Sequence, residues 1–217
     1  MSRSSRVFKF SMKSIARSLP LEYRKRLKSV VERRKWLYLV KNGADIRIEL
    51  GSGNKRGVNG WTTVDFGGAD IAHDLTTGIP LPDRSVKVIY SSHLFEHLNF
   101  QEILSLIAEC ERVLLPGGTI HTAVPNARLY IDAYVKGEEF KDKQVMHAPA
   151  ICDTSSPIDQ INYIAYMGNE HKYLFDELNL VRIFEKFQFR SVGLRDFDET
   201  MDSMDRKFET IYCVATK

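Results

Sequence analysis

A glycine-rich turn directly follows a short apolar run at residues 46–50. Gly51 and Gly53 flank Ser52, and glycines in such a turn allow positive φ and let the backbone approach a ligand closely. A dinucleotide fingerprint would need a glycine at position 56 with a helix next, but Arg56 stands there and residues 54–60 resemble a loop. The turn therefore indicates a ligand crevice and argues against NAD or NADP.

Two aspartates follow the turn at positions that can reach the same crevice. Asp65 closes a second apolar run, where its carboxylate could accept two hydrogen bonds from a ribose diol. Asp74 could bind an adenine amino group, with Leu75 packing on the ring. Either aspartate alone could equally be a turn or capping residue. Together with the glycine turn, the pair predicts a nucleoside-binding edge.

Histidines are the candidates for proton transfer, because an imidazole titrates near neutral pH. His93, His97 and His171 are the ones we consider, although each could equally be a structural histidine. The stretch from His93 to His97 matches the inverted zinc-protease motif H-x-x-E-H. That motif needs both histidines on a helix and a third ligand, whereas this one follows a strand, so no metal is expected. Glu96 is expected to start the following helix rather than to perform chemistry.

Alternating strands and helices must position these residues, which implies a parallel sheet covered by helices. Strands are expected at 46–50, 62–66, 86–91 and 119–124, with 116–118 as a turn. Helices are expected at 100–114 and 177–187, the first with Ile103, Leu106, Ile107, Cys110 and Val113 on one face. A final hairpin is expected from strands at 189–197 and 208–215. An irregular insertion or lid is expected at 126–172.

In combination these motifs resemble the class I S-adenosylmethionine-dependent methyltransferases. The resemblance covers roughly residues 45–126, with a looser echo in His171-Lys172. It rests on these stretches: Glu49 to Gly53, Gly60-Trp61, Val64-Asp65, His73 to Leu75, Leu81 to Val86, Ile89 to Leu98, and Glu111 to Gly118. Within this family, the sequence is similar to a small subgroup whose members often serve cell-surface polysaccharide or natural-product pathways. It implies an α/β, Rossmann-like methyltransferase fold with a mostly parallel seven-stranded sheet and an antiparallel C-terminal strand.

The resemblance also implies S-adenosylmethionine as the cofactor and a role for each motif. Glu49, Gly51, Ser52 and Gly53 would shape the pocket for the methionine part, Asp65 would hold the ribose, and Asp74 with Leu75 would bind adenine. Ser91, Ser92 and His93 would line the methyl-transfer site. The first helix after the glycine turn is expected to be lost or very short. Lys55 or Arg56 is therefore expected to bind the carboxylate end of the cofactor.

A basic N-terminal arm precedes this domain. The chain has 217 residues and a formal net charge of +3, but residues 1–40 carry twelve Lys and Arg against two acids, and acids outnumber bases in the rest. We place a basic helical arm at 1–43 and the methyltransferase domain at 44–217. Pro20 is expected to precede a helix at 21–40 whose apolar face (Leu27, Val30, Val31, Trp36, Leu37) packs on the domain or lies on an anionic membrane.

The sequence favours methyl transfer to an oxygen or nitrogen of a small-molecule or glycan acceptor. Transfer is a direct displacement, which needs alignment and a dry site. The segment from 129 to 173 is expected to build the acceptor site, and its tyrosines suit either sugars or simple packing. A nucleic-acid methyltransferase and a non-catalytic scaffold on the same fold stay open. Nucleic acid is disfavoured because the body is acidic.

Cysteine usage bears on the cellular compartment. Cys110, Cys152 and Cys213 are odd in number and form no CxxC pair, so neither a disulfide framework nor a cysteine zinc cluster is expected. A cytoplasmic protein, peripheral to a membrane if the arm binds one, is the simplest expectation. The Arg- and Ser-rich first 20 residues would also suit a transit peptide.

Overall fold

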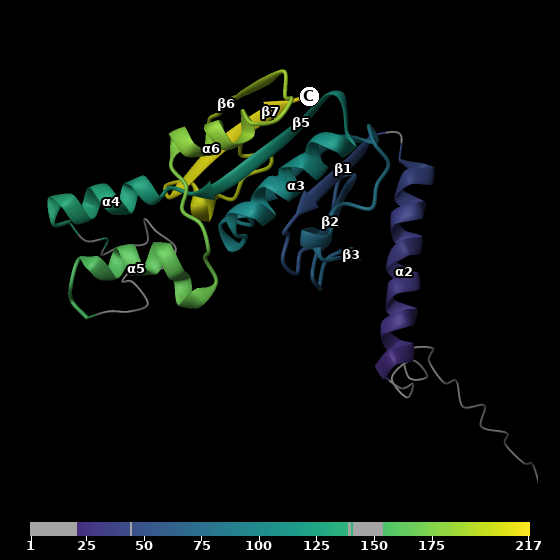
Figure 1. Cartoon of the computed structure of the whole chain (residues 1–217), viewed down its shortest axis with the longest axis horizontal. Helices are drawn as coiled ribbons and strands as arrows, with labels where there is room; N and C mark the ends of the chain where they lie inside the picture. The colour runs from purple at the N-terminus through teal and green to yellow at the C-terminus, as the bar shows by residue number, and fades with distance from the viewer. Residues whose placement is uncertain (1–20, 44, 139, 141–153) are drawn as a thin grey trace, which may run out of the picture.

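Seven strands form one sheet in the order β3-β2-β1-β4-β5-β7-β6 in the computed structural model of the chain (Figure 1). The structure describes residues 21–43, 45–138, 140 and 154–217. The expectations for the first 20 residues and for Cys152 lie outside this part. The strands are β1 (Ile46–Leu50), β2 (Trp61–Asp65), β3 (Ile71–Ala72), β4 (Val86–Ser92), β5 (Leu114–Pro125), β6 (Ser191–Leu194) and β7 (Thr210–Thr216).

The strand directions confirm the fold expected from the sequence. The pairs β1–β2, β1–β4, β2–β3 and β4–β5 are parallel, and β7 runs antiparallel to both β5 and β6. The carboxyl ends of β1, β2, β3 and β4 therefore meet at one edge of the sheet. In open α/β sheets this edge forms the ligand crevice, and every predicted cofactor residue lies at or near it.

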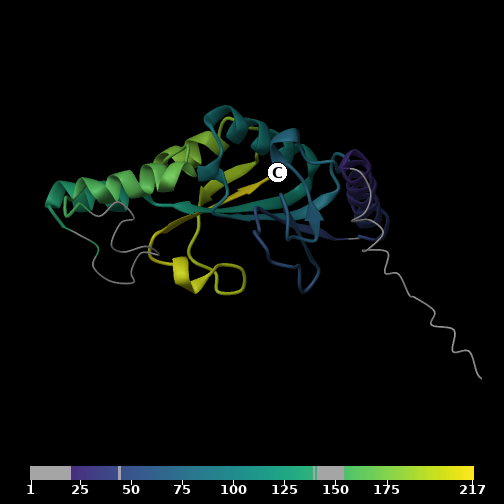
Figure 2. The same cartoon turned by 90° about the horizontal axis from the view of Figure 1, so that it is seen from below.

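Helices cover one face of the sheet, and loops cover the other (Figure 2). On the helical face, α3 (Phe100–Val113) and α6 (Glu177–Phe184) pack on the strands. The five apolar residues predicted for one face of α3 are all buried, and Asn99 with Glu102 forms a capping box at its start. On the other face, residues 53–60 are turns and coil, which confirms that the first helix after the glycine turn is missing.

The loop at 195–209 is anchored on the helix-free face by a buried ion pair. The two terminal guanidinium nitrogens of Arg195, Nη1 and Nη2, donate to the carboxylate of Asp202 at 2.6 and 2.8 Å. The Tyr90 hydroxyl donates to the same carboxylate at 3.1 Å, and burial is the main reason that the pKa of Tyr90 lies well above its usual value. Strand β4 and this loop are thereby tied together.

Helix α2 (Leu21–Asn42) lies along the β3 edge of the sheet (Figure 1). Glu32 accepts the Ala72 backbone N–H at 2.9 Å, and the Lys35 ammonium donates to the Asp70 carbonyl at 2.6 Å. These bonds occupy groups that an exposed edge strand would leave open. The helix expected at 21–40 is confirmed, and no helix in the described part of the chain is long and apolar enough to cross a membrane.

The apolar face predicted for this helix is only partly correct. Trp36 is buried, but Val30, Val31 and Leu37 are 44%, 42% and 59% exposed. The contact with the domain instead depends on Trp36 and the two charged side chains that reach the edge strand. The Leu27 side chain lies outside the described residues.

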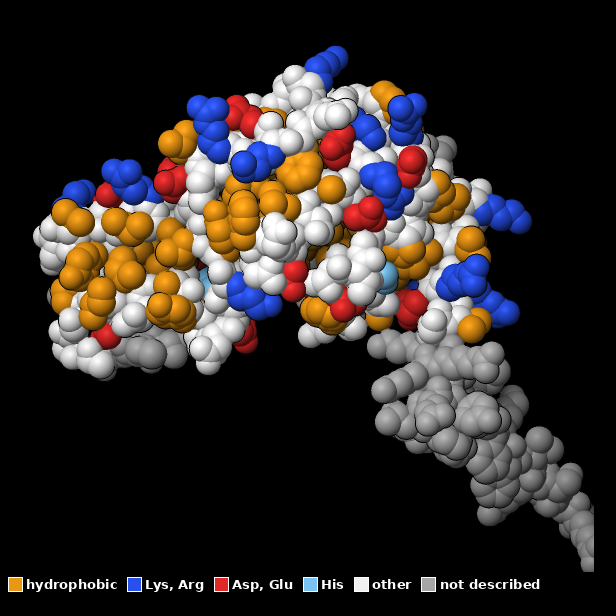
Figure 3. Space-filling view, viewed as in Figure 1, with side chains coloured by type: hydrophobic (Ala, Val, Ile, Leu, Met, Phe, Trp, Pro, Cys, Tyr) orange, Lys and Arg blue, Asp and Glu red, His pale blue; other side chains and the backbone are white. Residues whose placement is uncertain are grey.

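The expectation that residues 126–172 are irregular is wrong, because the described part of this segment contains two helices. α4 (Ala127–Lys136) and α5 (Ile158–Tyr166) pack on each other around Tyr130, Tyr163 and Ile164. Side chains on their outer surface form an apolar patch (Figure 3), with Val135 76% and Tyr166 60% exposed.

Two strand boundaries also differ from the sequence prediction. Pro116-Gly117-Gly118 is not a separate turn, because β5 runs through it from Leu114 to Pro125. The Gly117 N–H donates to the Lys217 carbonyl at 2.7 Å, so the segment stays paired despite a positive φ. The final hairpin is confirmed, with β6 and β7 adjacent and antiparallel but shorter than expected.

Candidate functional site

The glycine turn lies at the carboxyl end of β1 and combines close packing with open space. Gly51 has φ of 70°, and a Cβ there would meet the Leu94 side chain at 2.7 Å. Gly53 has φ of 63°, yet a Cβ there would meet nothing within 4 Å. The first glycine thus lets the turn pack on the segment after β4, and the second leaves room on the side of the crevice.

Asp65 ends β2 directly beside this turn. Its carboxylate accepts the Gly53 N–H at 2.8 Å and the Phe66 N–H at 2.6 Å. The carboxylate is partly exposed and keeps acceptor capacity for a further donor. Phe66 is 70% exposed, an unusual position for a large apolar ring. The sequence alone did not indicate Phe66, because residue type does not show that an apolar ring is exposed.

Asp74 and Leu75 follow β3 at the same edge but differ in accessibility. The Asp74 carboxylate accepts bonds from the Thr76 N–H and hydroxyl, at 3.0 and 2.6 Å, as the cap of a short 3-10 helix at Leu75–Thr77. The capping role that the sequence left open is therefore real. Leu75 is only 6% exposed and belongs to the core, so little of its side chain is left for an adenine ring.

Glu49 faces a cleft of about 400 Å³ on the helix-free side of the sheet. The Lys55 ammonium lies 3.6 Å from its carboxylate. Tyr90, Thr200 and Met201 line the same cleft, the last two from the anchored loop. Arg56 also borders the cleft, but its guanidinium donates to the Ala69 carbonyl at 2.6 Å and lies 3.6 Å from Asp70. Lys55 is therefore the freer of the two predicted cations.

The three serines at this edge have different surroundings. The hydroxyls of Ser52 and Ser91 are buried and have no hydrogen-bond partner among the described residues. Ser92 bonds the Tyr90 hydroxyl instead. Because alternate residues of a strand point to opposite faces, Ser92 faces the loops and Ser91 faces the helices. The structure thus brings Ser91, Ser92 and His93 to one strand end without giving them a common orientation.

A second pocket, of about 230 Å³, brings the three predicted catalytic histidines together. His93 follows β4 with φ of 54°, a conformation that non-glycine residues seldom adopt. Its Nε2 lies 3.0 Å from the Thr210 hydroxyl, and its Nδ1 lies 3.1 Å from a carboxylate oxygen of Glu96. The pocket is lined by His93, Glu96, His97, Pro125, Tyr163, Ile164, Met167, Glu170, His171, Arg206 and Glu209.

Glu96 occupies the interior of this pocket, so the expectation that it starts the next helix is wrong. It lies in a 3-10 turn at Phe95–His97, and α3 begins at Phe100. Its side chain is 2% exposed in a site otherwise rich in histidine. The Nδ1 of His171 lies 2.7 Å from the Ile164 carbonyl, and burial lowers the pKa of His171. That histidine is therefore neutral at pH 7.

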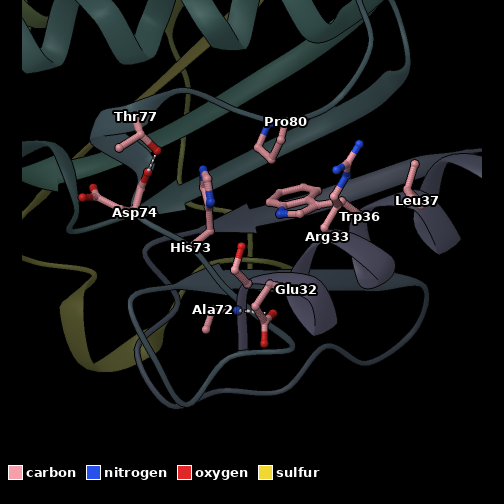
Figure 4. A pocket seen from close by; sticks show the side chains of 10 residues that line it. Glu32, Arg33, Trp36, Leu37, Ala72, His73, Asp74, Thr77 and Pro80 are labelled. Atoms are coloured by element: carbon pink, nitrogen blue, oxygen red, sulfur yellow. Dashed lines mark hydrogen bonds between the residues drawn. The ribbon is translucent and has the colours of Figure 1, made fainter. Parts of the chain in front are cut away.

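A cavity of about 500 Å³ lies between α2 and the segment after β3, apart from the pocket that contains His93, His97 and His171 (Figure 4). Trp36 meets His73 edge-on there, with ring centroids 5.6 Å apart. The Asp74 carboxylate points away from the other labelled side chains in this view. Asp74 is nevertheless among the residues that line the cavity, so the cavity adjoins the edge at which Asp65 and Asp74 lie.

Comparison with known proteins gives one family and one curated relative. Residues 49–122 match the family model described as a methyltransferase domain. A protein of Mycolicibacterium smegmatis, named a probable S-adenosylmethionine-dependent methyltransferase, is 42% identical over 57 residues, which are 26% of this chain. The match spans about a fifth (21%) of that relative's length.

Among solved structures, similarity extends over most of the chain at low identity. A S-adenosylmethionine-dependent methyltransferase of Archaeoglobus fulgidus is 14% identical, with 88% of this chain and 94% of that one covered and a TM-score of 0.49. One from Aquifex aeolicus is 16% identical, with 92% and 99% covered and a TM-score of 0.47.

The family match spans the glycine turn, both aspartates and strand β4, which His93 follows. The sheet that carries these residues has the expected parallel strands and the antiparallel β7. Residues 49–122 therefore match the methyltransferase-domain family, and the order and direction of the strands are those expected from the resemblance to the class I S-adenosylmethionine-dependent methyltransferases.

Proposed function

We propose that this protein transfers the methyl group of S-adenosylmethionine to an oxygen or nitrogen atom of a small-molecule or saccharide acceptor. The observation that carries the proposal is the meeting of two sites at one sheet edge. The glycine turn and Asp65 form the first, and the histidine pocket forms the second. His93, the residue after β4, connects them.

The residues at the edge fit this cofactor. Gly53 leaves open space, Asp65 keeps acceptor capacity for a ribose diol, and the exposed Phe66 ring offers a flat apolar surface for adenine. In the neighbouring cleft, Glu49 and Lys55 present opposite charges 3.6 Å apart. Such a pair matches the amino and carboxylate groups of a methionine moiety. Asp74 is the further acceptor for the adenine amino group.

When bound, S-adenosylmethionine supplies an electrophilic methyl group on a sulfonium. The chain's contribution is to align the acceptor, exclude water and take up a proton where the acceptor is a hydroxyl. His93 is the residue we assign to the proton, because Glu96 lies 3.1 Å from its Nδ1 and both side chains are almost fully buried. Its Nε2, which lies beside Thr210, is the nitrogen left to face an acceptor.

The size of the histidine pocket supports a small acceptor. A space of about 230 Å³ suits a sugar or another small ring and is too small for a structured nucleic acid. Tyr163 and Met167 contribute apolar walls to it, and Arg206, Glu170 and Glu209 contribute charge. This mixture suits a polar ring with hydroxyl groups better than a purely apolar substrate.

Calorimetric titration with S-adenosylmethionine tests the proposal. We expect wild type to bind with micromolar affinity and Asp65→Ala to lose at least tenfold, since a charge-assisted bidentate contact contributes about 1.5–3 kcal/mol. Asp45→Ala is the matched control, because Asp45 precedes β1 at the opposite end of the sheet and pairs with Lys87 on the surface. Absence of binding by wild type would leave the scaffold alternative.

For the N-terminal helix we propose contact with an anionic membrane surface. Val30, Val31, Leu37 and Tyr38 are exposed beside Arg33 and Arg34, so the helix presents apolar and cationic side chains outside its contact with the domain. Full-length protein should co-sediment with phosphatidylserine vesicles at low salt and release at high salt. Equal recovery with neutral vesicles would contradict an electrostatic contact.

A further inference from the structure

We propose that Glu96, His97 and His171 bind a divalent first-row transition-metal ion, of which Zn²⁺ is the simplest example. One ligand atom from each of these residues lies within 4.8 Å of the other two. The imidazole rings of His97 and His171 are 5.0 Å apart and nearly perpendicular. Two nitrogen donors and one carboxylate oxygen form a set that binds Zn²⁺ or other first-row ions and leaves positions open.

The spacing is close to what an ion requires. With metal–ligand distances of about 2.1 Å, ligand atoms in a tetrahedral site stand about 3.4 Å apart. The three ligand atoms, which lie within 4.8 Å of one another, would therefore need to move closer by up to about 1.4 Å to bind an ion.

Backbone carbonyls fix the state of both imidazoles. Nδ1 of His97 lies 3.1 Å from the Glu170 carbonyl, and Nδ1 of His171 lies 2.7 Å from the Ile164 carbonyl. A carbonyl can only accept, so each Nδ1 carries the proton and donates it. Each Nε2 is then left with a free lone pair. Metal-binding histidines in proteins are commonly held in this way, with the second ring nitrogen donating to a carbonyl or carboxylate.

Glu96 supplies an independent observation. Its side chain is 2% exposed, and both carboxylate oxygens are buried without a hydrogen-bond partner among the described residues. The nearest cation candidate is Nδ1 of His93 at 3.1 Å, but that contact lacks the angles of a hydrogen bond. An isolated buried carboxylate is costly unless it is paired or coordinates a metal. A bound cation would supply the missing partner.

The two halves of the site are already fixed to each other. The backbone N–H groups of Lys172 and Tyr173 both donate to the Glu96 carbonyl, at 2.7 and 3.2 Å. Residue 171 is thereby held against the 3-10 turn that carries Glu96 and His97, although the two segments are far apart in the sequence. His171 thus completes a ligand set with Glu96 and His97 that differs from the zinc-protease motif, because His93 is not one of its members.

The location suggests what the ion would bind. The ligands line the pocket that we assign to the methyl acceptor, next to His93. An acceptor with a hydroxyl or carboxylate oxygen could complete the coordination and be held there. This role depends on the proposed function, whereas the metal site itself does not.

Metal titration of the full-length protein after removal of bound metal tests the site. Calorimetry with Zn²⁺ and absorption spectroscopy with Co²⁺ should each show one equivalent bound, with Co²⁺ giving visible bands of nitrogen and oxygen ligation. His97→Gln and His171→Gln should each weaken Zn²⁺ binding at least tenfold. His73→Gln is the matched control, because His73 lies beside Trp36, away from the pocket, and should bind Zn²⁺ as wild type does.

Two results would overturn the metal site: no stoichiometric Zn²⁺ or Co²⁺ binding by wild type, or unchanged binding by the double variant His97→Gln/His171→Gln. S-adenosylmethionine binding is measured on the same samples, so that loss of the metal can be distinguished from loss of the cofactor site. If the variants do not fold, X-ray absorption of Zn²⁺-loaded wild type decides. Two imidazole ligands are expected, and a shell of oxygen or sulfur alone contradicts the site.

Discussion

Removal of the Asp202 carboxylate should destabilise the fold strongly, because it leaves a buried guanidinium without its partner. The Arg195 and Asp202 side chains are 12% and 1% exposed, and two bonds of 2.6 and 2.8 Å join them. The same carboxylate accepts the Tyr90 hydroxyl and the Asp198 N–H. Breaking a buried pair from one side costs about 3–5 kcal/mol, so Asp202→Ala should lower the free energy of unfolding by that amount.

Urea unfolding at pH 7, followed by tryptophan fluorescence, measures this effect. Trp61 packs against Tyr90 at 6.3 Å between ring centroids and reports on the same region. The double variant Arg195→Met/Asp202→Leu should recover most of the loss, since it removes both charges. As a control for an exposed pair, Asp132→Ala breaks the surface contact with Arg128 and should leave the free energy of unfolding nearly unchanged.

A cost below about 1 kcal/mol for Asp202→Ala would refute the reasoning that this pair anchors the loop. The loop also carries Thr200 and Met201 to the cleft that contains Glu49. Asp202→Ala should therefore weaken S-adenosylmethionine binding even under conditions in which the variant is folded.

Three further predictions follow from other parts of the fold. Hydrogen bonds from Arg112, opposed by desolvation, hold the pKa of Glu109 below its usual 4.5. The ionised Glu109 therefore stabilises the folded state fully above pH 4.5, and this contribution is lost as the pH falls through the folded-state pKa. Glu109→Gln should cost about 1–2 kcal/mol in urea titrations at pH 7 and less at pH 3; equal costs would contradict this. Gly53→Ala should lower the free energy of unfolding by only about 1 kcal/mol, because of the positive φ at this position. The same change should weaken S-adenosylmethionine binding in calorimetry, and unchanged affinity would show that the turn does not face the cofactor. Trp36→Ala should cost about 3 kcal/mol in thermal unfolding and expose α2 to proteases; an unchanged cleavage rate would argue against docking through Trp36.

The sheet and α3 could be predicted because their residues repeat with the period of one structure. Between Ile46 and Val113, the apolar runs mark the strands, and the capping box at Asn99 marks the start of α3. The continuous strand through Pro116-Gly117-Gly118 could not be predicted. Its pairing depends on Lys217, at the far end of the chain.

The candidate site could be predicted only in part, because some of its contacts also join residues that are far apart in the sequence. Gly51, Gly53 and Asp65 act through residues near them in the chain, so local motifs indicate them. Glu96 has no such signal, because its burial depends on His171 and on two backbone bonds from the segment that follows α5. Phe66 was missed because exposure of an apolar ring cannot be read from residue type alone.

A crystal structure of the protein with S-adenosylhomocysteine would test the central claim most directly. The ribose should contact Asp65, the adenine should lie near Phe66 and Asp74, and the amino-acid end should lie between Glu49 and Lys55. The sulfur should face the pocket that contains His93. A nucleoside bound elsewhere, for example in the cavity between α2 and β3, would contradict the assignment of this edge as the methyl-transfer site.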